Sequence, residues 1–228
     1  MLCYFCGREF SADDHTDDDH VPMRQLYAKD IRRAHHPNLL TLRVHRACHK
    51  DFQLDEDYFV NSLTAFASDT YSGQHAWSDS QRTLRRVESA GLRERIINEF
   101  SEISPGGIYA PPGKMFKRYD SIRIGNIIWK ITRGLFYYRF KRYLPLDAPK
   151  RVQFTPPGEK PPKEFAILKG CDSMGQYPGV FDYKMKEVKE IVPGVELHCH
   201  TFGYLFWNKI IILCHLHDPL CSCGPCKG

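Results

Sequence analysis

Hydrophobic and polar positions near the N-terminus predict two short strands and two helices. The first strand runs into the β-prone Val21 and ends at Pro22, because proline cannot donate a hydrogen bond to a neighbouring strand. A second strand is predicted over 39–44 (LLTLRV), and a short helix begins at about Arg46. Residues 54–66 form a longer predicted helix with an acidic first turn, where the helix dipole favours negative charge.

The stretch that follows is predicted to contain one loop and one helix. Residues 67–77 (ASDTYSGQHAW) form the loop. The helix starts with a capping box between Ser78 and Gln81, bends at Gly91 and continues to Phe100. The glycine- and proline-rich sequence SPGGIYAPPGK comes next and is predicted to be a second loop.

A long amphipathic helix is predicted in the middle of the chain. Its apolar positions step by four and three and form one stripe, made of Ile124, Ile128, Ile131, Leu135 and Tyr138. Arg123 and Lys130 fall on another face, with Arg133 nearby. We expect the stripe to be buried and the basic face to be exposed and to bind the phosphates of a nucleic acid. An ordinary surface helix with core aromatic residues would give the same pattern.

From about Val152 onward the pattern is typical of an antiparallel sheet, because short apolar runs alternate with turn residues. The predicted strands are 164–170, 179–188, 195–207 and 209–216. We expect the long basic helix to pack against this sheet. The hydrophobic pattern as a whole therefore predicts an α+β protein.

Positive charge is concentrated around the long helix. The net charge is +5 at pH 7, yet residues 1–70 hold 8 basic and 12 acidic residues. Residues 71–228 hold 24 basic and 15 acidic residues. Residues 114–151 alone hold 11 basic and 2 acidic residues, which accounts for the whole excess. Such a segment favours a polyanionic partner.

Composition favours a soluble cytoplasmic protein. Hydrophobic residues make up 42% of the chain, which is enough for a packed core. The N-terminus does not resemble a signal peptide. The longest apolar stretch is interrupted by Asn208 and Lys209 and is too short to span a bilayer. The nine cysteines, an odd number, fit metal binding in a reducing compartment better than a set of disulfides.

Four residues near the N-terminus form two pairs with zinc-ligand spacing. Cys3 and Cys6 form a C-x2-C pair followed by Gly7, a turn that aims both thiolates at one ion. His45 and Cys48 repeat the spacing. Together the pairs predict a closed structural zinc site with three thiolates and one imidazole. Two unrelated buried pairs remain the alternative.

An Asp–His pair, an asparagine and a final histidine follow in a set order around these pairs. They are Asp19 and His20, then Asn38, then His49 directly after the last zinc ligand. This arrangement resembles the HNH endonucleases of the ββα-metal (His-Me finger) class. The resemblance covers roughly residues 3–60.

The resemblance implies a strand pair and a helix that are clamped by zinc, and a nuclease active site on that frame. Its one departure is His45, where most relatives have a cysteine. Histidine is an ordinary zinc ligand, so zinc binding is still expected. Asp51 is a weaker substitute for this ligand.

Phosphodiester hydrolysis needs a base for the attacking water and a cation that stabilises the leaving oxygen. We expect His20 to be the base, and Asp19 and His49 to hold a catalytic Mg²⁺ or Mn²⁺. Successive side chains on a strand alternate, so the base and the cation would flank the phosphate from opposite sides. Asn38 is expected to brace the loop that faces the base.

A second Asp–His pair, Asp14 and His15, competes for the same role. The later pair is preferred because Val21 and Pro22 give its strand a β-prone continuation and an end. Two histidines, His35 and His36, precede Pro37 and are expected to form a surface turn rather than to be metal ligands.

The C-terminal part holds further candidate metal ligands. They are Cys214, Cys221, Cys223, Cys226, His215 and His217. These residues bind a second zinc, or they belong to a mobile thiol-rich end. In the sequence LHCH, alternation places His198 and His200 on one face of a strand and Cys199 on the other, which favours ordinary packing.

The sequence thus predicts an HNH nuclease domain over 1–70 and a second domain over 71–228, made of helices and the antiparallel sheet. The expected activity is metal-dependent hydrolysis of DNA, with RNA not excluded. A single site of this kind nicks one strand, so a second copy or a protein partner is needed for double-strand cutting. The alternative is a zinc-organised module that binds nucleic acid or protein and does not cut.

Overall fold

The computed structural model describes residues 2–104, 106–176 and 179–222, which contain helices and three antiparallel sheets. The strands are β1 (Thr16–His20), β2 (Thr41–His45), β3 (Phe100–Ser101), β4 (Phe116–Lys117), β5 (Lys150–Thr155), β6 (Met174–Gln176), β7 (Phe181–Val192), β8 (Val195–Phe206) and β9 (Ile210–His217). The α-helices are α1 (Lys29–His35), α2 (Arg46–Lys50), α3 (Gln53–Leu63), α4 (Tyr71–Leu84), α5 (Ala90–Asn98) and α6 (Ser121–Phe140). Short 3-10 helices are η1 (Arg24–Leu26), η2 (Thr64–Ala67), η3 (Val87–Ser89) and η4 (Lys163–Leu168).

The N-terminal part is a two-stranded sheet followed directly by a short helix. Strands β1 and β2 are antiparallel, with Asp19 opposite Leu42 and His20 opposite Thr41. Helix α2 begins at Arg46, the residue after β2 ends. The predicted strand pair and the short helix after it are therefore confirmed.

The C-terminal part is a five-stranded antiparallel sheet with the order β5-β9-β8-β7-β6. The prediction of an antiparallel sheet is confirmed, but the strand predicted over 164–170 is wrong, because this stretch forms η4. Its apolar residues are consecutive rather than alternating, and Phe165 and Leu168 lie over Gly203 of β8. A Cβ at this glycine would lie 2.4 Å from Leu168 Cδ1.

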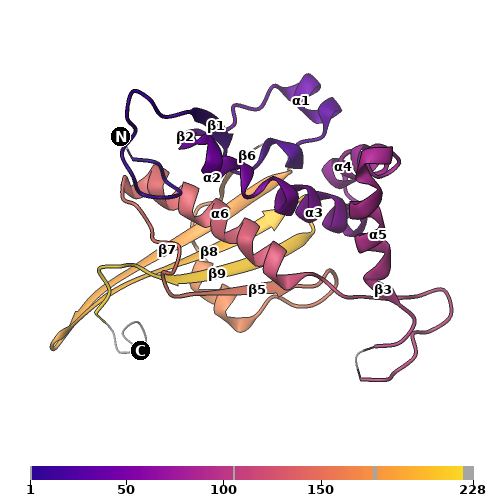
Figure 1. Cartoon of the computed structure of the whole chain (residues 1–228). Coiled ribbons are helices and arrows are strands. Elements are labelled where there is room, and N and C mark those ends of the chain that lie inside the picture. The colour runs from indigo at the N-terminus through magenta and orange to yellow at the C-terminus, as the bar shows by residue number, and fades with distance from the viewer. Residues whose placement is uncertain (1, 105, 177–178, 223–228) are drawn as a thin grey trace.

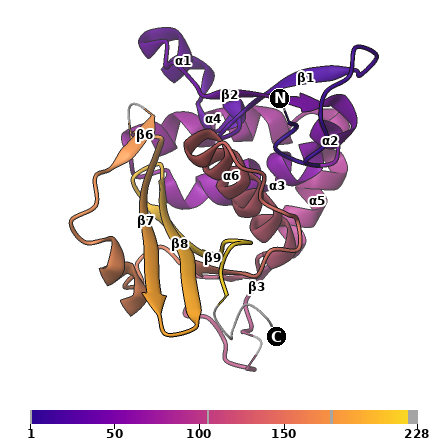
Figure 2. The same cartoon turned by 90° about the vertical axis from the view of Figure 1, so that its left-hand side faces the viewer.

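Helix α6 lies between the N-terminal layer and the large sheet (Figure 1). The view in Figure 2 shows α6 on one face of β7, β8 and β9, with α2 and α3 on its other side. Thr132 Oγ1 lies 2.6 Å from the Tyr204 hydroxyl of β8, which ties the helix to the sheet. The expected packing of the long helix on the sheet is confirmed, and its apolar stripe is buried except for Tyr138, which is 50% exposed.

One hydrophobic core runs through all of these layers. It reaches from Cys3 in the N-terminal part to Leu216 in β9, with α6 in the middle. Within the described residues no helix combines the length and the hydropathy that a membrane span requires.

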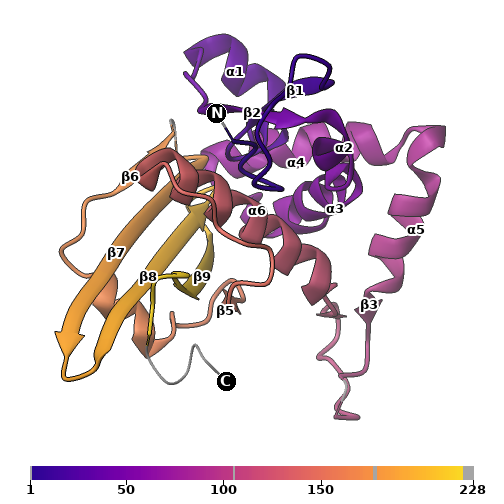
Figure 3. The same cartoon turned by 60° about the vertical axis from the view of Figure 1, so that its left-hand side comes forward.

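Helix α4 packs against α3 and α5 packs against α4, away from β7 and β8 (Figure 3). The loop predicted over 67–77 is wrong, because α4 begins at Tyr71 and its N-cap is Thr70, whose side chain accepts a hydrogen bond from the Gly73 amide. The capping box predicted at Ser78 is therefore also wrong. The close approach of Gly73 to the Ala67 carbonyl, where a Cβ would lie only 1.9 Å away, explains why a glycine stands in this helix.

Candidate functional site

The two N-terminal cysteines lie on a tight turn. The Cys3 amide donates to the Arg8 carbonyl (2.9 Å), and the Gly7 amide donates to the Cys3 carbonyl (2.9 Å). Gly7 has a φ of +74°, a left-handed conformation that glycine adopts without strain. The turn brings the Cys3 and Cys6 thiols to the same side of the chain.

The second pair of ligands comes from the end of β2 and from α2, so all four predicted zinc ligands meet. The ligand atoms of Cys3, Cys6, His45 and Cys48 lie within 4.8 Å of one another. Cys6 Sγ is 3.2 Å from His45 Nδ1. Three thiols and one imidazole match the donor set of a closed structural zinc site, so these residues fit a zinc ion.

The surroundings of these ligands favour metal binding. Burial raises the pKa of the Cys6 thiol, but hydrogen bonds from Arg8 outweigh burial and lower this pKa to about 6, which favours the thiolate that zinc requires. Asp14 Oδ2 lies 3.2 Å from His45 Nε2, so the carboxylate holds the imidazole with Nδ1 toward the cluster. The competing pair is thus split: Asp14 contacts a predicted zinc ligand, while His15 is exposed.

Arg133 is not on an exposed basic face, so this part of the sequence prediction is wrong. The residue is fully buried, and it donates to the Phe5 carbonyl, between the two N-terminal cysteines, and to the Leu144 carbonyl (2.9 Å). Its guanidinium lies 5.3 Å from the centre of the Phe5 ring. A residue so placed positions the cysteine turn against α6 and is not available to a nucleic acid.

Lys130 is also buried, which makes the prediction of its exposure wrong as well. Only 1% of the residue is exposed, and its ammonium donates to Asp19 Oδ1 (2.8 Å) and to Glu56. The helical pattern gave the wrong face because α6 is covered on both sides, by the sheet and by the N-terminal layer. Two carboxylates offset the cost of burying one ammonium group.

Arg123, the third predicted nucleic-acid contact, is half-buried and paired. Its guanidinium lies 2.7 Å from Asp55 Oδ1 and 3.3 Å from Asp120 Oδ2. It holds the first turn of α6 against α3.

Asp19 and His49, the predicted ligands of a catalytic cation, lie next to each other. His49 Nε2 is 3.6 Å from Asp19 Oδ1, and His49 Nδ1 is 3.4 Å from Asp17 Oδ2. Asp19 is 2% exposed, and its other oxygen accepts a hydrogen bond from Tyr4. The strand alternation that was expected places Asp17 and Asp19 together on the side of α2 and α6.

This arrangement does not fit Mg²⁺ or Mn²⁺ as it stands. A hard divalent cation takes about six oxygen ligands and keeps several waters. Here both oxygens of Asp19 accept hydrogen bonds, and the Lys130 ammonium lies where a cation would bind. The positive charge beside Asp19 is therefore supplied by the protein.

His20 lies on the other face of β1 and opens to solvent through a cleft of about 480 Å³. The residues around this cleft are mostly basic or polar: His20, Arg24, Arg32, His36, Pro37, Asn38 and Leu39. Burial, together with the charge of Arg24, lowers the pKa of His20 below that of an exposed histidine. At neutral pH the imidazole is therefore uncharged and able to accept a proton.

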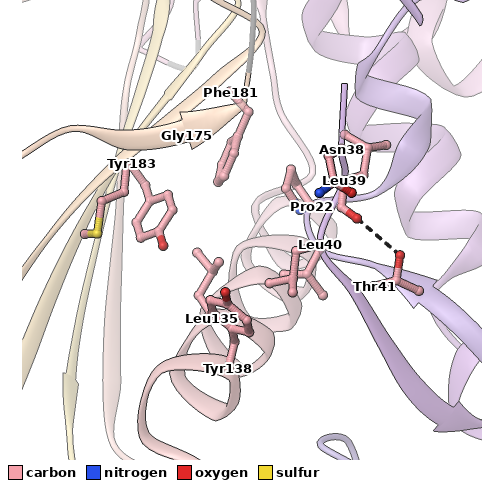
Figure 4. A pocket seen from close by; sticks show the side chains of 12 residues that line it. Pro22, Asn38, Leu39, Leu40, Thr41, Leu135, Tyr138, Gly175, Phe181 and Tyr183 are labelled. Atoms are coloured by element: carbon pink, nitrogen blue, oxygen red, sulfur yellow. Dashed lines mark hydrogen bonds between the residues drawn. The ribbon is translucent and has the colours of Figure 1, made fainter. Parts of the chain in front are cut away.

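A second cleft of about 530 Å³ adjoins the first and shares Asn38 and Leu39 with it. Figure 4 shows this cleft between the β1–β2 hairpin, α6 and the edge of the large sheet, with Tyr183, Phe181 and Tyr138 around the opening. Thr41, which is paired with His20, lies on its wall and donates to the Leu39 carbonyl (3.3 Å). Asn38 thus lies on the ridge between a basic cleft and an aromatic one.

Three residues of the basic cleft were not recognised in the sequence as parts of a site. Arg24 and Arg32 come from η1 and α1, and His36 is the left-handed residue that ends α1 with a φ of 43°. Charged residues on a short helix give no local signal for a site. Only the insertion of η1 and α1 between the two strands of the hairpin brings these side chains to His20.

No protein-family model, no curated protein and no solved structure matches this chain.

Proposed function

We propose that this protein is an endonuclease that hydrolyses phosphodiester bonds in DNA, with His20 as the general base. The observation that carries the proposal is the basic cleft, in which an uncharged imidazole on a hairpin end lies among two guanidinium groups. The zinc-compatible cluster supports the proposal because it fixes the hairpin that carries the imidazole.

The cleft has groups suited to two parts of this chemistry. His20 takes a proton from the attacking water as the water forms a bond to phosphorus. Arg24 and Arg32 bind the phosphate oxygens and stabilise the negative charge that increases in the transition state. Asn38 positions the substrate strand at the ridge between the two clefts.

The aromatic cleft gives the substrate class. A phosphate next to His20 places the adjoining nucleotide near Tyr183 and Tyr138, and aromatic side chains stack on nucleobases at about 1–3 kcal/mol per base. A base can reach these rings only when it is unpaired. We therefore propose that single-stranded or locally unpaired DNA is the preferred substrate.

Binding of the divalent cation predicted at Asp19 and His49 is proposed only for a conformation that differs from this structure. Lys130 has to leave Asp19 before a metal can bind there. The side chains described above carry out their steps without it.

The experiment is incubation of the purified full-length chain with supercoiled plasmid and with labelled single-stranded DNA, in Mg²⁺, in Mn²⁺ and in EDTA. We expect the wild-type protein to cleave DNA and the Arg24→Ala/Arg32→Ala variant to lose this activity. Activity that persists in EDTA assigns the charge stabilisation to the arginines, and activity that requires a divalent cation assigns it to a metal that displaces Lys130. No cleavage under any of these conditions contradicts the proposal.

A second function is favoured by one observation. Lys130 neutralises Asp19 in a buried position, as expected for a zinc-organised module that binds nucleic acid without cutting it. Binding of single-stranded DNA in a fluorescence anisotropy assay, without cleavage of any substrate, is the result that would favour this alternative.

A further inference from the structure

A second group of metal-ligating side chains lies on the large sheet, outside the site described above. It consists of Cys199, His215 and His217, whose ligand atoms lie within 4.8 Å of one another. The three residues come from β8 and β9, on which no part of the proposed nuclease mechanism depends.

The strand register brings these ligands together. Cys199 is directly opposite His217, and Thr201 is directly opposite His215. Because side chains alternate along a strand, all of these side chains lie on one face of the sheet. Cys199 Sγ is 3.0 Å from His217 Nδ1, and the rings of the two histidines are 5.1 Å apart. The backbone ladder therefore preorganises the site.

The opposite face of the same strands has a different role. His200 packs between Phe136 and Phe140 of α6 and lies 3.1 Å from Asp218 Oδ2, so it belongs to the core. Cys214 is fully buried on this α6 side and cannot join a cluster with its neighbour His215. The candidate set that the sequence suggested is therefore divided between two faces. Cys223 and Cys226 of that set lie outside the described residues.

His215 has the supporting contact that metal-ligating histidines usually make. Its Nδ1 lies 2.8 Å from Thr201 Oγ1, which orients the ring and leaves Nε2 for a metal. The Cys199 thiol supplies a soft donor, and two imidazoles beside it form a set that prefers zinc to Mg²⁺ or Ca²⁺.

We propose that Cys199, His215 and His217 bind one Zn²⁺ through three protein ligands, independently of the N-terminal cluster. Tetrahedral zinc has four positions, of which these three described residues occupy three. A cavity of about 370 Å³ beside the site is lined by His215, Thr201, Arg151 and Lys163, among others. The lining also includes Glu164, so two cationic side chains and one carboxylate give this cavity a net positive charge.

The test is elemental analysis of zinc in the full-length protein, purified without chelator and checked for folding by circular dichroism. The His215→Ala/His217→Ala variant is compared with His198→Ala, a matched control whose side chain points to the other face of β8. We expect the double variant to contain about one zinc per chain less than the wild type, and the control to lose none. Replacing zinc by Co²⁺ should give a thiolate-to-cobalt band that decreases in Cys199→Ser.

Equal zinc content in the wild type and the double variant overturns the proposal. If the double variant does not fold, a second measurement tests the proposal on the wild type and on Cys199→Ser. A thiol-blocking mercurial should release about one equivalent more zinc from the wild type than from Cys199→Ser, and equal release would overturn the proposal. A Cys223→Ser/Cys226→Ser variant is expected to retain this zinc. Its loss there would overturn the assignment to these three ligands.

Discussion

At the scale of single residues, two neighbours on one strand have opposite environments. Asp19 is buried among Tyr4, Lys130 and His49, while His20 lines a basic cleft that is open to solvent. The strand alternation alone requires this separation. In the proposed mechanism, proton transfer takes place on the open side of β1. On the closed side, Lys130 neutralises the Asp19 carboxylate.

We expect His20→Gln to abolish cleavage and to leave DNA affinity and zinc content unchanged. The loss should be about 10²–10⁴-fold or more, the contribution of general-base catalysis. Single-turnover cleavage of labelled DNA measures it. His15→Ala is the control, because His15 is exposed and outside the cleft, and it should cut at the wild-type rate. If His15→Ala were inactive and His20→Gln were active, the catalytic pair would be Asp14 and His15 instead of Asp19 and His20.

The pH dependence of cleavage follows from the lowered pKa of His20. Only the neutral imidazole accepts a proton, so activity is lost as pH falls through this pKa. Because burial and Arg24 lower the pKa below the 6.5 of an exposed histidine, the acidic midpoint of kcat/KM should lie below 6.5. Replacing Arg24 by Gln should raise the midpoint. A midpoint above 6.5 in the wild type would contradict the role of His20.

At the scale of elements, α6 and the cysteine turn position the hairpin. Gly134 lies in α6 where the helix meets the end of β1, and a Cβ there would be 2.7 Å from Val21 Cγ2. Val21 is the residue after His20. The spacing between helix and strand therefore depends on the absence of one methyl group.

We expect Gly134→Ala to destabilise the protein by about 1–3 kcal/mol, the usual cost of overpacking, and to reduce cleavage because Val21 moves His20. Gly125→Ala is the matched control in the same helix, since a Cβ there has nothing within 4 Å. The control should be unchanged or more stable by about 0.5–1 kcal/mol, because alanine favours helix. Urea unfolding measures both. Equal stability of the two variants would contradict the close contact.

The zinc cluster is the second support of the hairpin. Cys48→Ser should remove about one zinc per chain and unfold the N-terminal layer, because a structural zinc site contributes directly to folding. Cys171→Ser is the control, as Cys171 lies outside both metal-compatible groups. Elemental analysis and thermal unfolding are the measurements, and a folded Cys48→Ser protein with unchanged zinc would refute the assignment.

At the scale of the whole molecule, the basic segment is divided between the core and the surface. Lys130 and Arg133 are buried, whereas Arg139 and Lys141 are exposed at the end of α6, beside Tyr138 of the aromatic cleft. Part of the positive charge that is available to a polyanion therefore lies next to the aromatic cleft.

We expect Arg139→Glu/Lys141→Glu to weaken DNA binding and to flatten its salt dependence. Removing one ionic interaction with a phosphate of single-stranded DNA should reduce the slope of log K against log salt by about 0.7. Arg85→Glu/Arg86→Glu makes the same charge change at the exposed end of α4 and should have a smaller effect. Anisotropy titrations at several salt concentrations measure the slopes. Equal slopes in the two variants would show that the end of α6 is not part of the DNA-binding surface.

Features that depend on local spacing could be predicted from the amino-acid sequence. Two x2 pairs were enough to predict a set of four ligands that meets in the structure, because each pair lies on one turn. The end of β1 before Pro22 and the start of α2 at Arg46 followed from similarly local rules. Strands β7, β8 and β9 followed from runs and turns, whereas β5 and β6 were not predicted and the consecutive apolar residues over 164–170 formed η4 instead of a strand.

The burial of charged residues and the grouping of residues around a cleft could not be predicted in this way, because both depend on how the elements pack. A helical period defines faces but cannot tell that α6 is covered on two sides, so Lys130 and Arg133 were assigned to solvent. Arg24 reaches His20 because the chain between the two strands folds back, a contact that no local pattern encodes. Burial and cross-element contacts depend on the packing of segments far apart in sequence, which side-chain periodicity does not specify.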